Sequence, residues 1–474
     1  MRTLEEILSK ASDITADSRK VIPGAVFVAV PGFSIDGHDF IGDAIAKGAA
    51  AVVYERDEAL AGLDKGDTAF FKVESSRRAL AEMASAFFGH PSRKLRLTVI
   101  TGTNGKTTTV TLLYKLFMDL GYNCGLLSTI ANYVGKKQLE TTNTTSDPVT
   151  TNRLLAQMVD EGCEYCFMEA SSIGIEQDRV TGLDFDVAIF SNLTHDHLDY
   201  HKTFAEYLRC KKLLFDRLPK EAVALINTDD KNGPVMVQNT AAKVVTYALQ
   251  RAADHRCKIL EESFDGMLLR IDDTDIWTRL IGRHNAYNLL AIYSAALALG
   301  ANRDEVLVAL SRLESAKGRL EVMHGPKNIS VILDYAHTPD ALDNVLKTLR
   351  DIAPGEQLVC VFGCGGDRDR SKRPEMAAVA EKYADRIIVT SDNSRSEKTE
   401  DILEEIRGGF STKGLAKALF IADRREAIRT AIITAPEGAA ILLAGKGHET
   451  YQIIGKEKFH FDEREITEEI FKSL

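Results

Sequence analysis

The segment Thr101-Gly102-Thr103-Asn104-Gly105-Lys106-Thr107 holds the residue types that point most directly to chemistry. Gly102 and Gly105 let the backbone turn tightly, so that its N–H groups approach phosphate oxygens at the start of the following helix. Lys106 can neutralise β- and γ-phosphates, and the Thr107 hydroxyl is placed to bind Mg²⁺. The usual P-loop pattern has a glycine where this chain has Ile100. The order of strand, glycine loop and helix nevertheless predicts nucleotide binding, with an ordinary strand-to-helix turn as the alternative.

Further chemical residues follow two later strand-like runs. Glu169 ends a run that begins Tyr165-Cys166-Phe167, where a carboxylate downstream of a P-loop can organise Mg²⁺; a helix cap or a surface residue is the alternative. Residues 192–201 follow the apolar run 187–190 and include three histidines and two aspartates. Such a set can coordinate a metal through oxygen or imidazole. Spacing alone does not select the ligands.

The elements that must position these residues follow from the hydrophobic pattern. Residues 94–100 form a short strand-like run directly before the glycine loop. After the loop, apolar residues recur at helical spacing, and Gly121 stands where a helix C-cap is expected. The helical residues are Leu112, Leu113, Leu116, Phe117 and Leu120. Strand-like and helical segments alternate almost throughout the chain, which predicts α/β layers with largely parallel sheets.

Length and charge limit the classes of protein that fit. A chain of 474 residues is too long for one core, so several domains are expected. The net charge of −10, without a basic block, argues against nucleic acid as the main partner. The N-terminal residues lack a signal-peptide pattern, and no apolar run approaches the ~18 residues that span a bilayer, so we expect a cytoplasmic protein without a membrane span.

Cysteine number and turn residues add two further expectations. Seven cysteines fit reduced thiols better than disulfides. The pairs Cys163 with Cys166 and Cys360 with Cys364 lack a second pair at zinc spacing, which favours buried small side chains over metal ligands. Turn-forming residues at 89–92, 316–319 and 325–326 indicate three domains, 1–92, 93–319 and 320–474.

A series of motifs occurs in one order along the chain. It comprises T-G-T-N-G-K-T-T-T at 101–109, E-A-S-S at 169–172, N-L-T-H-D-H-L-D-Y-H at 192–201, G-R-H-N-A-Y-N at 282–288 and D-Y-A-H-T-P-D at 334–340. This series resembles the Mur ligase family. Residues 17–24 and 36–40 resemble the N-terminal UDP-binding domain of that family, and the resemblance covers about residues 15–460.

The resemblance implies a fold and a reaction. The fold is α/β with three domains: an N-terminal UDP-binding α/β domain, a central P-loop ATPase domain and a C-terminal Rossmann-like domain that binds the incoming amino acid. Segments 363–369 and 445–449 are similar to the members that add the third residue of the peptidoglycan stem. With ATP and Mg²⁺, such a ligase activates the side-chain carboxylate of D-glutamate in UDP-N-acetylmuramoyl-L-alanyl-D-glutamate as an acyl phosphate, which an amine then attacks. These small molecules are the expected partners, and we expect a monomer.

The resemblance also implies roles for individual residues. Lys106 contacts the phosphates, while Thr107, Glu169 and His197 organise magnesium. Lys211 matches the family lysine that CO₂ converts to N6-carboxylysine, which then supports a second Mg²⁺; the adjacent Lys212 leaves this assignment ambiguous by one position. The expected ATP contacts are Gly102, Thr103, Asn104, Gly105, Lys106, Thr107, Thr108, Asn288, Arg319, Asp334 and His337. For Arg319 a structural salt bridge remains the alternative.

Two substrate sites can be carried over in the same way. The expected contacts to the UDP-muramyl-dipeptide are Ser18, Arg19, His38, Thr144, Thr145, Ser171, Gln177 and Arg179. Residues that resemble a meso-diaminopimelate site are Arg368, Asp392, Asn393, Arg395, Gly445 and Glu449. In that family signature, D-N-P-R, this chain has Ser394 in place of proline, which removes a fixed φ. We still expect diaminopimelate, because a guanidinium at Arg395 suits its extra carboxylate.

Three other functions fit parts of the pattern. The L-lysine-adding form of the same ligase differs only in the amino acid that it takes. A folylpolyglutamate synthase has a similar ATPase core but lacks the N-terminal domain indicated by residues 17–40. A P-loop nucleotide switch would leave Arg368, Arg395 and Glu449 without a function.

Overall fold

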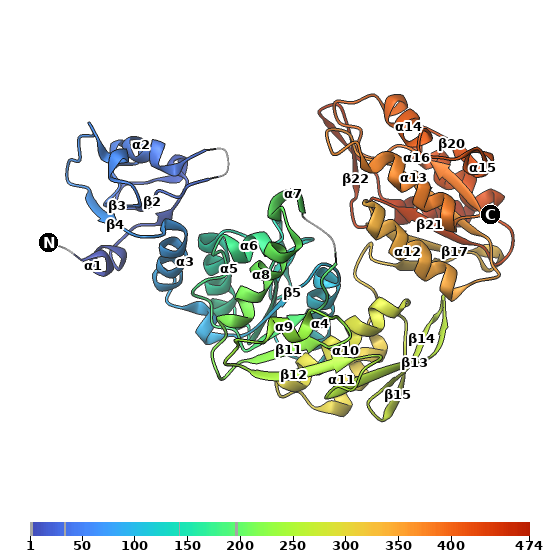
Figure 1. Cartoon of the computed structure of the whole chain (residues 1–474), viewed down its shortest axis with the longest axis horizontal. Coiled ribbons are helices and arrows are strands. Elements are labelled where there is room, and N and C mark those ends of the chain that lie inside the picture. Colours follow the sequence, from blue (N-terminus) through green and yellow to red (C-terminus); the bar gives the residue numbers. More distant parts are fainter. Residues whose placement is uncertain (1–2, 33–34, 142, 195–197) are drawn as a thin grey trace. The chain divides into compact units, whose positions relative to one another are not determined.

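The computed structural model describes residues 3–32, 35–141, 143–194 and 198–474. The chain divides into two compact units, Met1–Arg256 with Asn288–Ala309 and Cys257–Tyr287 with Leu310–Leu474. Each unit is built from sheets covered by helices (Figure 1). Most strand pairs are parallel, which confirms the predicted α/β class.

The first unit begins with a small parallel sheet of order β1-β2-β3-β4. Its strands are β1 (Ile14–Thr15), β2 (Val26–Val28), β3 (Ala51–Tyr54) and β4 (Ala69–Lys72). Around it lie α1 (Leu4–Leu8), α2 (Ile41–Ala46), α3 (Ser76–Phe87) and the short 3₁₀ helices η1 (Ser18–Lys20), η2 (Gly37–Phe40), η3 (Asp57–Leu60) and η4 (Pro91–Lys94). The central strand β2 is apolar throughout because both of its faces are covered: Val26 and Val28 pack in one cluster and Phe27 in the other.

A larger sheet follows in the same unit, with the order β12-β11-β10-β5-β9-β6-β7-β8. Its strands are β5 (Arg96–Thr101), β6 (Cys124–Leu127), β7 (Asn132–Val134), β8 (Lys137–Leu139), β9 (Tyr165–Glu169), β10 (Val187–Phe190), β11 (Val223–Asn227) and β12 (Lys243–Ala248). The associated helices are α4 (Lys106–Asp119), α5 (Pro148–Asp160), α6 (Ser172–Glu176), α7 (Leu198–His201), α8 (Phe204–Asp216), α9 (Gly233–Met236), α10 (Arg283–Ala298) and α11 (Arg303–Arg312).

Alternation along the strands explains how the helices are distributed. Cys166 and Met168 of β9 pack in one cluster with residues of α5 and α8. Phe167, between them in sequence, contacts Phe117 of α4 with the rings tilted, at 5.1 Å between ring centroids. Because successive side chains of a strand point to opposite faces, α4 covers the face opposite α5 and α8. The predicted C-cap of α4 is also present: Gly121 has a φ of 93° directly after the helix end.

The second unit contains an antiparallel meander and a parallel sheet. The meander comprises β13 (His255–Ser263), β14 (Gly266–Ile271) and β15 (Thr274–Thr278). The sheet has the order β16-β17-β21-β18-β19-β20, in which only β16 runs antiparallel to its neighbour. Its strands are β16 (Glu321–His324), β17 (Ser330–Asp334), β18 (Leu358–Phe362), β19 (Arg386–Val389), β20 (Ala418–Phe420) and β21 (Ala440–Ala444).

Helices cover both faces of this second sheet, again by alternation (Figure 1). Leu442 packs on the face of α12 (Pro339–Ile352), α13 (Lys372–Tyr383) and α14 (Thr399–Arg407). Ile441 and Leu443 pack on the face of α16 (Arg424–Thr434) and α17 (Glu463–Ser473). The remaining elements are α15 (Thr412–Lys417), η5 (Pro326–Asn328) and a hairpin of β22 (Tyr451–Ile454) and β23 (Glu457–His460).

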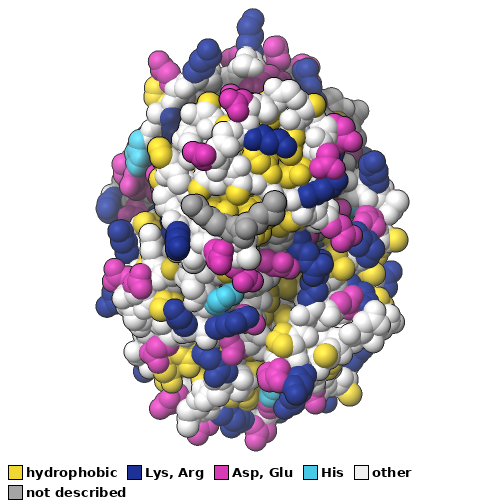
Figure 2. Space-filling view, turned by 90° about the vertical axis from the view of Figure 1, so that its left-hand side faces the viewer, with side chains coloured by type: hydrophobic (Ala, Val, Ile, Leu, Met, Phe, Trp, Pro, Cys, Tyr) yellow, Lys and Arg dark blue, Asp and Glu magenta, His cyan; other side chains and the backbone are white. Residues whose placement is uncertain are grey.

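Surface and cysteine features complete the description. Among the residues that the structure describes, no helix has the length and apolar character needed to cross a bilayer. Acidic and basic side chains are interspersed on the face shown in Figure 2. All seven cysteines are buried and have free thiols.

A buried ion pair provides a test of how the C-terminal sheet is held together. Arg424 and Glu463 are both fully buried, with Nε and Oε1 2.8 Å apart, and the guanidinium also donates to Ser391 O and Ala444 O. We expect Arg424→Met to lower the free energy of unfolding by about 3–5 kcal/mol, because Glu463 then stays buried without a counter-ion. Urea unfolding followed by circular dichroism measures this change.

The neighbouring Arg425 offers a matched control, because its pair with Glu469 is more than half exposed. Arg425→Ala should change stability little, since exposed ion pairs contribute weakly. The double variant R424M/E463L should recover most of the loss. Equal, small effects of R424M and R425A would contradict a structural role for the buried pair.

Candidate functional site

The sheet topology places three predicted segments at one edge. β5 pairs in parallel with β9 on one side and with β10 on the other. Because the carboxyl ends of parallel strands meet at the same edge, the glycine loop, Glu169 and the segment from Ser191 lie together. Ile100, which stands where a P-loop pattern has glycine, is a buried residue of β5 paired with Glu169 of β9. The tight turn therefore starts later than the pattern requires.

The glycine loop is packed closely on its surroundings. Gly105 caps α4 with a φ of 88°, and a Cβ there would lie 2.5 Å from Asn288 Oδ1. Asn288, from α10, also accepts from Thr109 Oγ1 at 3.4 Å. The predicted nucleotide contact Asn288 is thus next to the loop and helps to set its path.

Two lysines converge on this loop. Lys106 Nζ donates to Gly102 O and to Thr103 O, each at 2.9 Å. Lys211, from α8, is fully buried and donates to the same Gly102 O at 2.9 Å. Lys212 instead pairs with Asp216 on the same helix, so Lys211 is the lysine that reaches the loop. Two ammonium groups beside a helix N-terminus form a strongly positive place that suits phosphates.

Glu169 is the acidic residue of this site. Its side chain is buried at the end of β9, where Oε2 accepts from Thr107 Oγ1 at 3.0 Å. The backbone N–H of Thr129 donates to Oε1 at 2.8 Å, and the Thr129 hydroxyl donates to Oε2 at 3.1 Å. Burial raises the pKa of the Glu169 carboxyl, and the charge of Lys106 opposes that shift. The Thr107 hydroxyl and the Glu169 carboxylate are the hard oxygen donors that Mg²⁺ prefers, so they fit this ion. His197 lies outside the described residues.

Three residues that hold the site were not singled out in the sequence. Thr129 is one, because it binds both oxygens of Glu169. Ser191 Oγ donates to Asn104 O at 2.7 Å, and Asn192 both accepts from Asn104 N at 2.9 Å and donates to Asn104 O at 3.1 Å. Asn192 opens the polar segment 192–201, but nothing in its spacing indicates a partner in the glycine loop.

Five of the eight predicted contacts to the UDP-muramyl-dipeptide belong to one hydrogen-bonded series that starts at Glu169: Thr144, Thr145, Ser171, Gln177 and Arg179. Thr145 Oγ1 donates to Glu169 O at 3.2 Å and accepts from Ser171 N at 2.9 Å. Arg179 donates to Thr145 O at 2.7 Å and, through Nε and Nη2, to Gln177 Oε1. Thr144 Oγ1 lies 3.1 Å from Thr129 Oγ1, which binds Glu169.

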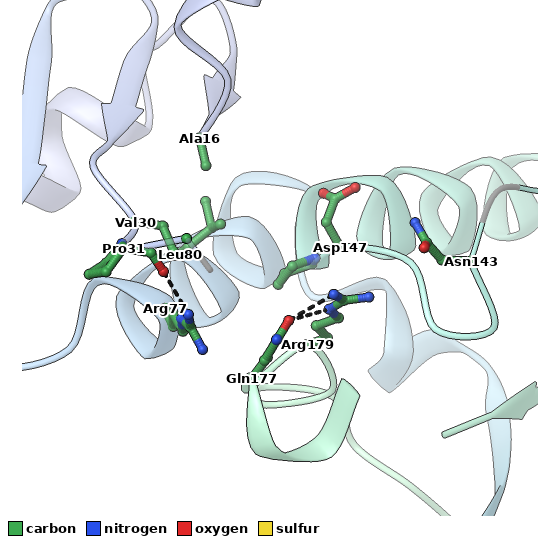
Figure 3. Close-up of a pocket in the computed structure, with 11 residues that line it drawn as sticks. Ala16, Val30, Pro31, Arg77, Leu80, Asn143, Asp147, Gln177 and Arg179 are labelled. Atoms are coloured by element: carbon green, nitrogen blue, oxygen red, sulfur yellow. Dashed lines mark hydrogen bonds between the residues drawn. The ribbon is translucent and has the colours of Figure 1, made fainter. Parts of the chain in front are cut away.

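Two cavities lie in the first unit, and Gln177 and Arg179 of this series line one of them. One, of about 390 Å³, is lined by Arg77 and Leu80 of α3 together with Asn143, Asp147, Gln177 and Arg179 (Figure 3). A second, of about 670 Å³, is lined by residues 13–20, including Ser18 and Arg19. His38 lines neither cavity: its buried ring lies 2.7 Å from Asp36 Oδ1 through Nδ1 and accepts from Glu55 N at 3.0 Å through Nε2. His38 is thus hydrogen-bonded inside the N-terminal region, between Asp36 and Glu55.

In the second unit, the remaining predicted nucleotide residues surround Tyr335. Asp334 is buried and accepts from Leu320 N and Ala336 N, each at 2.8 Å. Arg319 lies over the Tyr335 ring, 5.1 Å from its centroid, and His337 Nδ1 lies 2.9 Å from Tyr335 O. Asp334 therefore fixes the turn that carries Arg319.

The predicted diaminopimelate residues also lie together in the second unit. Asn393 donates to Glu449 Oε2 at 2.9 Å, and a Cβ on Gly445 would lie 2.8 Å from Asp392 Oδ2. The side chains of Arg368 and Arg395 flank Gly365, where a Cβ would meet Arg395 Nη1 at 3.0 Å and Arg368 Cγ at 3.9 Å. Acidic and guanidinium groups thus occupy neighbouring positions at the carboxyl ends of β18, β19 and β21.

Lys446 holds this group in place and was not predicted as a site residue. It is fully buried and donates to Asn393 Oδ1 at 3.2 Å and to Tyr451 O at 2.6 Å; Glu449 Oε2 is 3.5 Å away. Burial lowers the pKa of its ammonium, and the carboxylate of Asp392 opposes the shift. Lys446 links the two loops that carry Asn393 and Glu449.

The backbone around Ser394 is held by its neighbours. Arg395 has a φ of 51°, donates from its backbone N–H to Ile453 O at 3.2 Å, and donates from Nη1 to Gly366 O at 2.8 Å. A Cβ on Gly366 would collide with Ser394 O, so glycine is required for this close approach. The loop is therefore confined without the proline of the D-N-P-R signature.

Asn192 provides a test of how the glycine loop is set. We expect Asn192→Ala to weaken nucleotide binding about 30-fold, because two hydrogen bonds to Asn104, each worth roughly 1 kcal/mol, are lost. Asn192→Asp keeps the acceptor for Asn104 N and should have an intermediate effect. Titration with a fluorescent ATP analogue measures the affinity. Wild-type affinity in Asn192→Ala would show that these bonds do not set the loop.

Family models match three consecutive stretches of the chain. The model described as "Mur ligase family, catalytic domain" matches residues 10–88, "Mur ligase middle domain" matches 100–296, and "Mur ligase, glutamate ligase domain" matches 318–447. These matches agree with a three-domain α/β fold and with the resemblance seen in the motifs.

Relatives match almost the whole chain. UDP-N-acetylmuramoyl-L-alanyl-D-glutamate--2,6-diaminopimelate ligase of Cytophaga hutchinsonii is 50% identical over 465 residues, which cover 98% of this chain and 95% of the relative. The protein with the same name from Phocaeicola vulgatus is 48% identical over 99% of this chain and 97% of the relative. A solved structure of a ligase with that name aligns with a TM-score of 0.72 and 33% identity, over 98% of this chain and 95% of the other. The chain therefore belongs to the Mur ligase family.

Proposed function

We propose that the protein is the ATP-dependent ligase that joins meso-2,6-diaminopimelate to UDP-N-acetylmuramoyl-L-alanyl-D-glutamate in peptidoglycan synthesis. The observation that carries the proposal is the cluster of Asn393, Arg395 and Glu449, in a family member whose relatives at about 50% identity bear that name. This cluster offers a guanidinium for a carboxylate and a carboxylate for an amine, and diaminopimelate has a carboxylate and an amine at each end.

The reaction begins at the glycine loop. The side-chain carboxylate of D-glutamate attacks the γ-phosphorus of ATP, the bond to the β-phosphate oxygen breaks, and ADP leaves. The loop N–H groups and Lys106 hold the phosphates and stabilise the charge that develops on them. Thr107 and Glu169 would hold Mg²⁺, together with His197, and the ion would neutralise phosphate charge. A free carboxylate is a poor electrophile, and the acyl phosphate makes it reactive.

Amide formation follows. An amine of diaminopimelate attacks the acyl carbon, the tetrahedral intermediate collapses, and inorganic phosphate leaves while the nitrogen loses a proton. Thr145, Ser171, Gln177 and Arg179 form the series that would hold the dipeptide end beside Glu169. Their role is to keep the carboxylate in line with the transferred phosphoryl group.

Lys211 fits the proposed carbamylation. As a carbamate, its nitrogen keeps one N–H, which can still donate to Gly102 O as the ammonium does now. The new carboxylate would replace a positive charge by oxygen ligands for a second Mg²⁺. The buried position of Lys211 separates it from bulk water, where a carbamate is readily lost.

Selection of diaminopimelate is assigned to the second unit. Arg395 and Arg368 would bind the distal carboxylate, and Glu449, Asp392 and Asn393 would bind the amine, with Gly445 leaving room beside Asp392. L-Lysine lacks the distal carboxylate and would leave the Arg395 guanidinium without a partner. Arg319, Asp334 and His337 are proposed as further ATP contacts.

Other parts of the proposal rest on the same residues. We assign domains to 1–92, 93–319 and 320–474, and we expect a cytoplasmic monomer. The match of residues 10–88 to a Mur ligase model disfavours a folylpolyglutamate synthase, which lacks that domain. A nucleotide switch would not need the residues at 392–395 and 445–449.

The activity can be tested with the purified protein. We expect phosphate release from ATP that requires Mg²⁺, the UDP-muramyl-dipeptide and diaminopimelate, with L-lysine giving a far lower kcat/KM. EDTA should abolish release, and excess Mg²⁺ should restore it. Release that does not depend on the dipeptide, or that is faster with L-lysine, would contradict the proposal.

Arg395 provides the specificity test. We expect Arg395→Ala to lower kcat/KM for diaminopimelate about 100-fold, since a charged pair worth roughly 3 kcal/mol is lost, while KM for ATP is unchanged. Arg395→Lys should keep only part of the wild-type kcat/KM for diaminopimelate, because an ammonium cannot form the bidentate contact of a guanidinium with a carboxylate. Arg386→Ala is the matched control: Arg386 precedes this loop on β19 and donates to Thr434. An unchanged kcat/KM in Arg395→Ala would remove this residue from the amino-acid site.

A further inference from the structure

We infer that Arg77 is a substrate-binding residue that, together with Arg179, binds one oxyanion of the UDP-muramyl-dipeptide. The inference rests on the proposed function and assigns a residue from the N-terminal sheet domain to the substrate site. The oxyanion is either the α-carboxylate of the D-glutamyl end or the diphosphate, since both offer paired oxygens to a guanidinium.

The two arginines reach one cavity from distant parts of the chain. Arg77 is the second residue of α3, and Arg179 follows α6. Both line the cavity of about 390 Å³, which Val30, Pro31 and Gly32 also border (Figure 3). Arg179 already belongs to the hydrogen-bonded series that leads to Glu169, so an anion between the two arginines would lie beside residues proposed to hold the dipeptide.

The charge balance of the cavity is positive. Arg77, Arg179 and Asp147 are the charged residues among its described lining. Asp147 is occupied as the N-cap of α5, where its carboxylate accepts from Thr150 N at 3.0 Å and from Thr150 Oγ1 at 2.6 Å. Burial lowers the pKa of Arg179 and so does the charge of Arg77, although the charge of Asp147 opposes this shift. A bound anion would relieve both effects.

Arg77 is held in place and keeps donors for a ligand. Its Nη2 donates to Pro31 O at 2.6 Å, and this is the only hydrogen bond of the side chain within the described part of the chain. A guanidinium has five N–H groups, so several can serve an anion. Arg179 is likewise held by Gln177 and Thr145. Both guanidiniums are thus oriented before substrate binds.

The start of α3 is anchored through the framework that contains His38. Ser76 donates from its backbone N–H and its hydroxyl to Glu55 Oε1, at 2.6 and 2.7 Å. Glu55 N in turn donates to His38 Nε2 at 3.0 Å. This chain of bonds fixes the backbone beside Arg77 and lowers the entropy lost when the anion binds. It also gives the buried His38 a role in the substrate site through its neighbours.

The first test is steady-state kinetics of the full-length enzyme. We expect Arg77→Ala to raise KM for the UDP-muramyl-dipeptide about 10- to 100-fold, the range for a charged hydrogen-bonded contact, with KM for ATP and diaminopimelate within about twofold. The dipeptide KM of Arg77→Lys should lie between the values for wild type and Arg77→Ala. Arg78→Ala is the matched control: Arg78 is the next residue of the same helix, is mostly exposed and pairs with Glu82. An unchanged dipeptide KM in Arg77→Ala overturns the inference.

A second measurement separates direct contact from a structural effect and identifies the oxyanion. One test substrate has the D-glutamyl α-carboxylate converted to an amide. If Arg77 binds that carboxylate, the wild-type enzyme should bind this amide more weakly than the natural substrate. The Arg77→Ala enzyme should bind the amide and the natural substrate with nearly the same affinity. If it binds the diphosphate, competitive inhibition by UDP, which has no carboxylate, should weaken in Arg77→Ala by the factor found for the substrate. The inference would be overturned if Arg77→Ala raised the KM for the dipeptide but changed neither the effect of the amide substitution nor the inhibition by UDP. A wild-type enzyme without dipeptide-dependent phosphate release would instead contradict the proposed function.

Discussion

The parallel pairing of β5 with β9 and β10 is the constraint on which the nucleotide site depends. It brings the carboxyl ends of three strands to one edge and so aligns the loops that follow them. Asn104 and Asn192 are 88 residues apart in sequence, yet they share two hydrogen bonds because their strands are neighbours. A buried carboxylate and two ammonium groups can then surround a single loop.

The C-terminal sheet follows the same rule with different chemistry. β21 lies between β17 and β18, so the segments after Asp334, Phe362 and Ala444 lie at one edge. Here the loops are held by buried cations: Lys446 joins the loops of Asn393 and Glu449, and Arg424 binds the backbone after β19 and β21. Burying these charges costs free energy of folding, and in return their hydrogen bonds hold the loops in one geometry. The proposed amino-acid site, which would distinguish diaminopimelate from L-lysine, needs a defined geometry of this kind.

Much of the fold was predictable, because each element is locally consistent. The apolar runs at 165–167 and 187–190, the helical spacing after Lys106 and the C-cap at Gly121 all became the expected elements. The motifs also indicated the family, since their order and spacing match three consecutive domain models. The residues that support the site were harder to find. Thr129, Ser191 and Lys446 are ordinary residue types whose partners are distant in sequence.

The sequence by itself determined the α/β class, the nucleotide loop and the family, because these depend on local periodicity and on specific motifs. Only the tertiary structure decided how individual residues act. It showed why Ile100 can replace a glycine, since β5 continues through that position, and how Gly366 and Ile453 confine the loop at Ser394 without a proline. In the tertiary structure the His38 ring is buried between Asp36 and Glu55, and Arg77 and Arg179 line the same cavity. Side-chain direction and long-range pairing arise from the packing of whole layers, which no local pattern encodes.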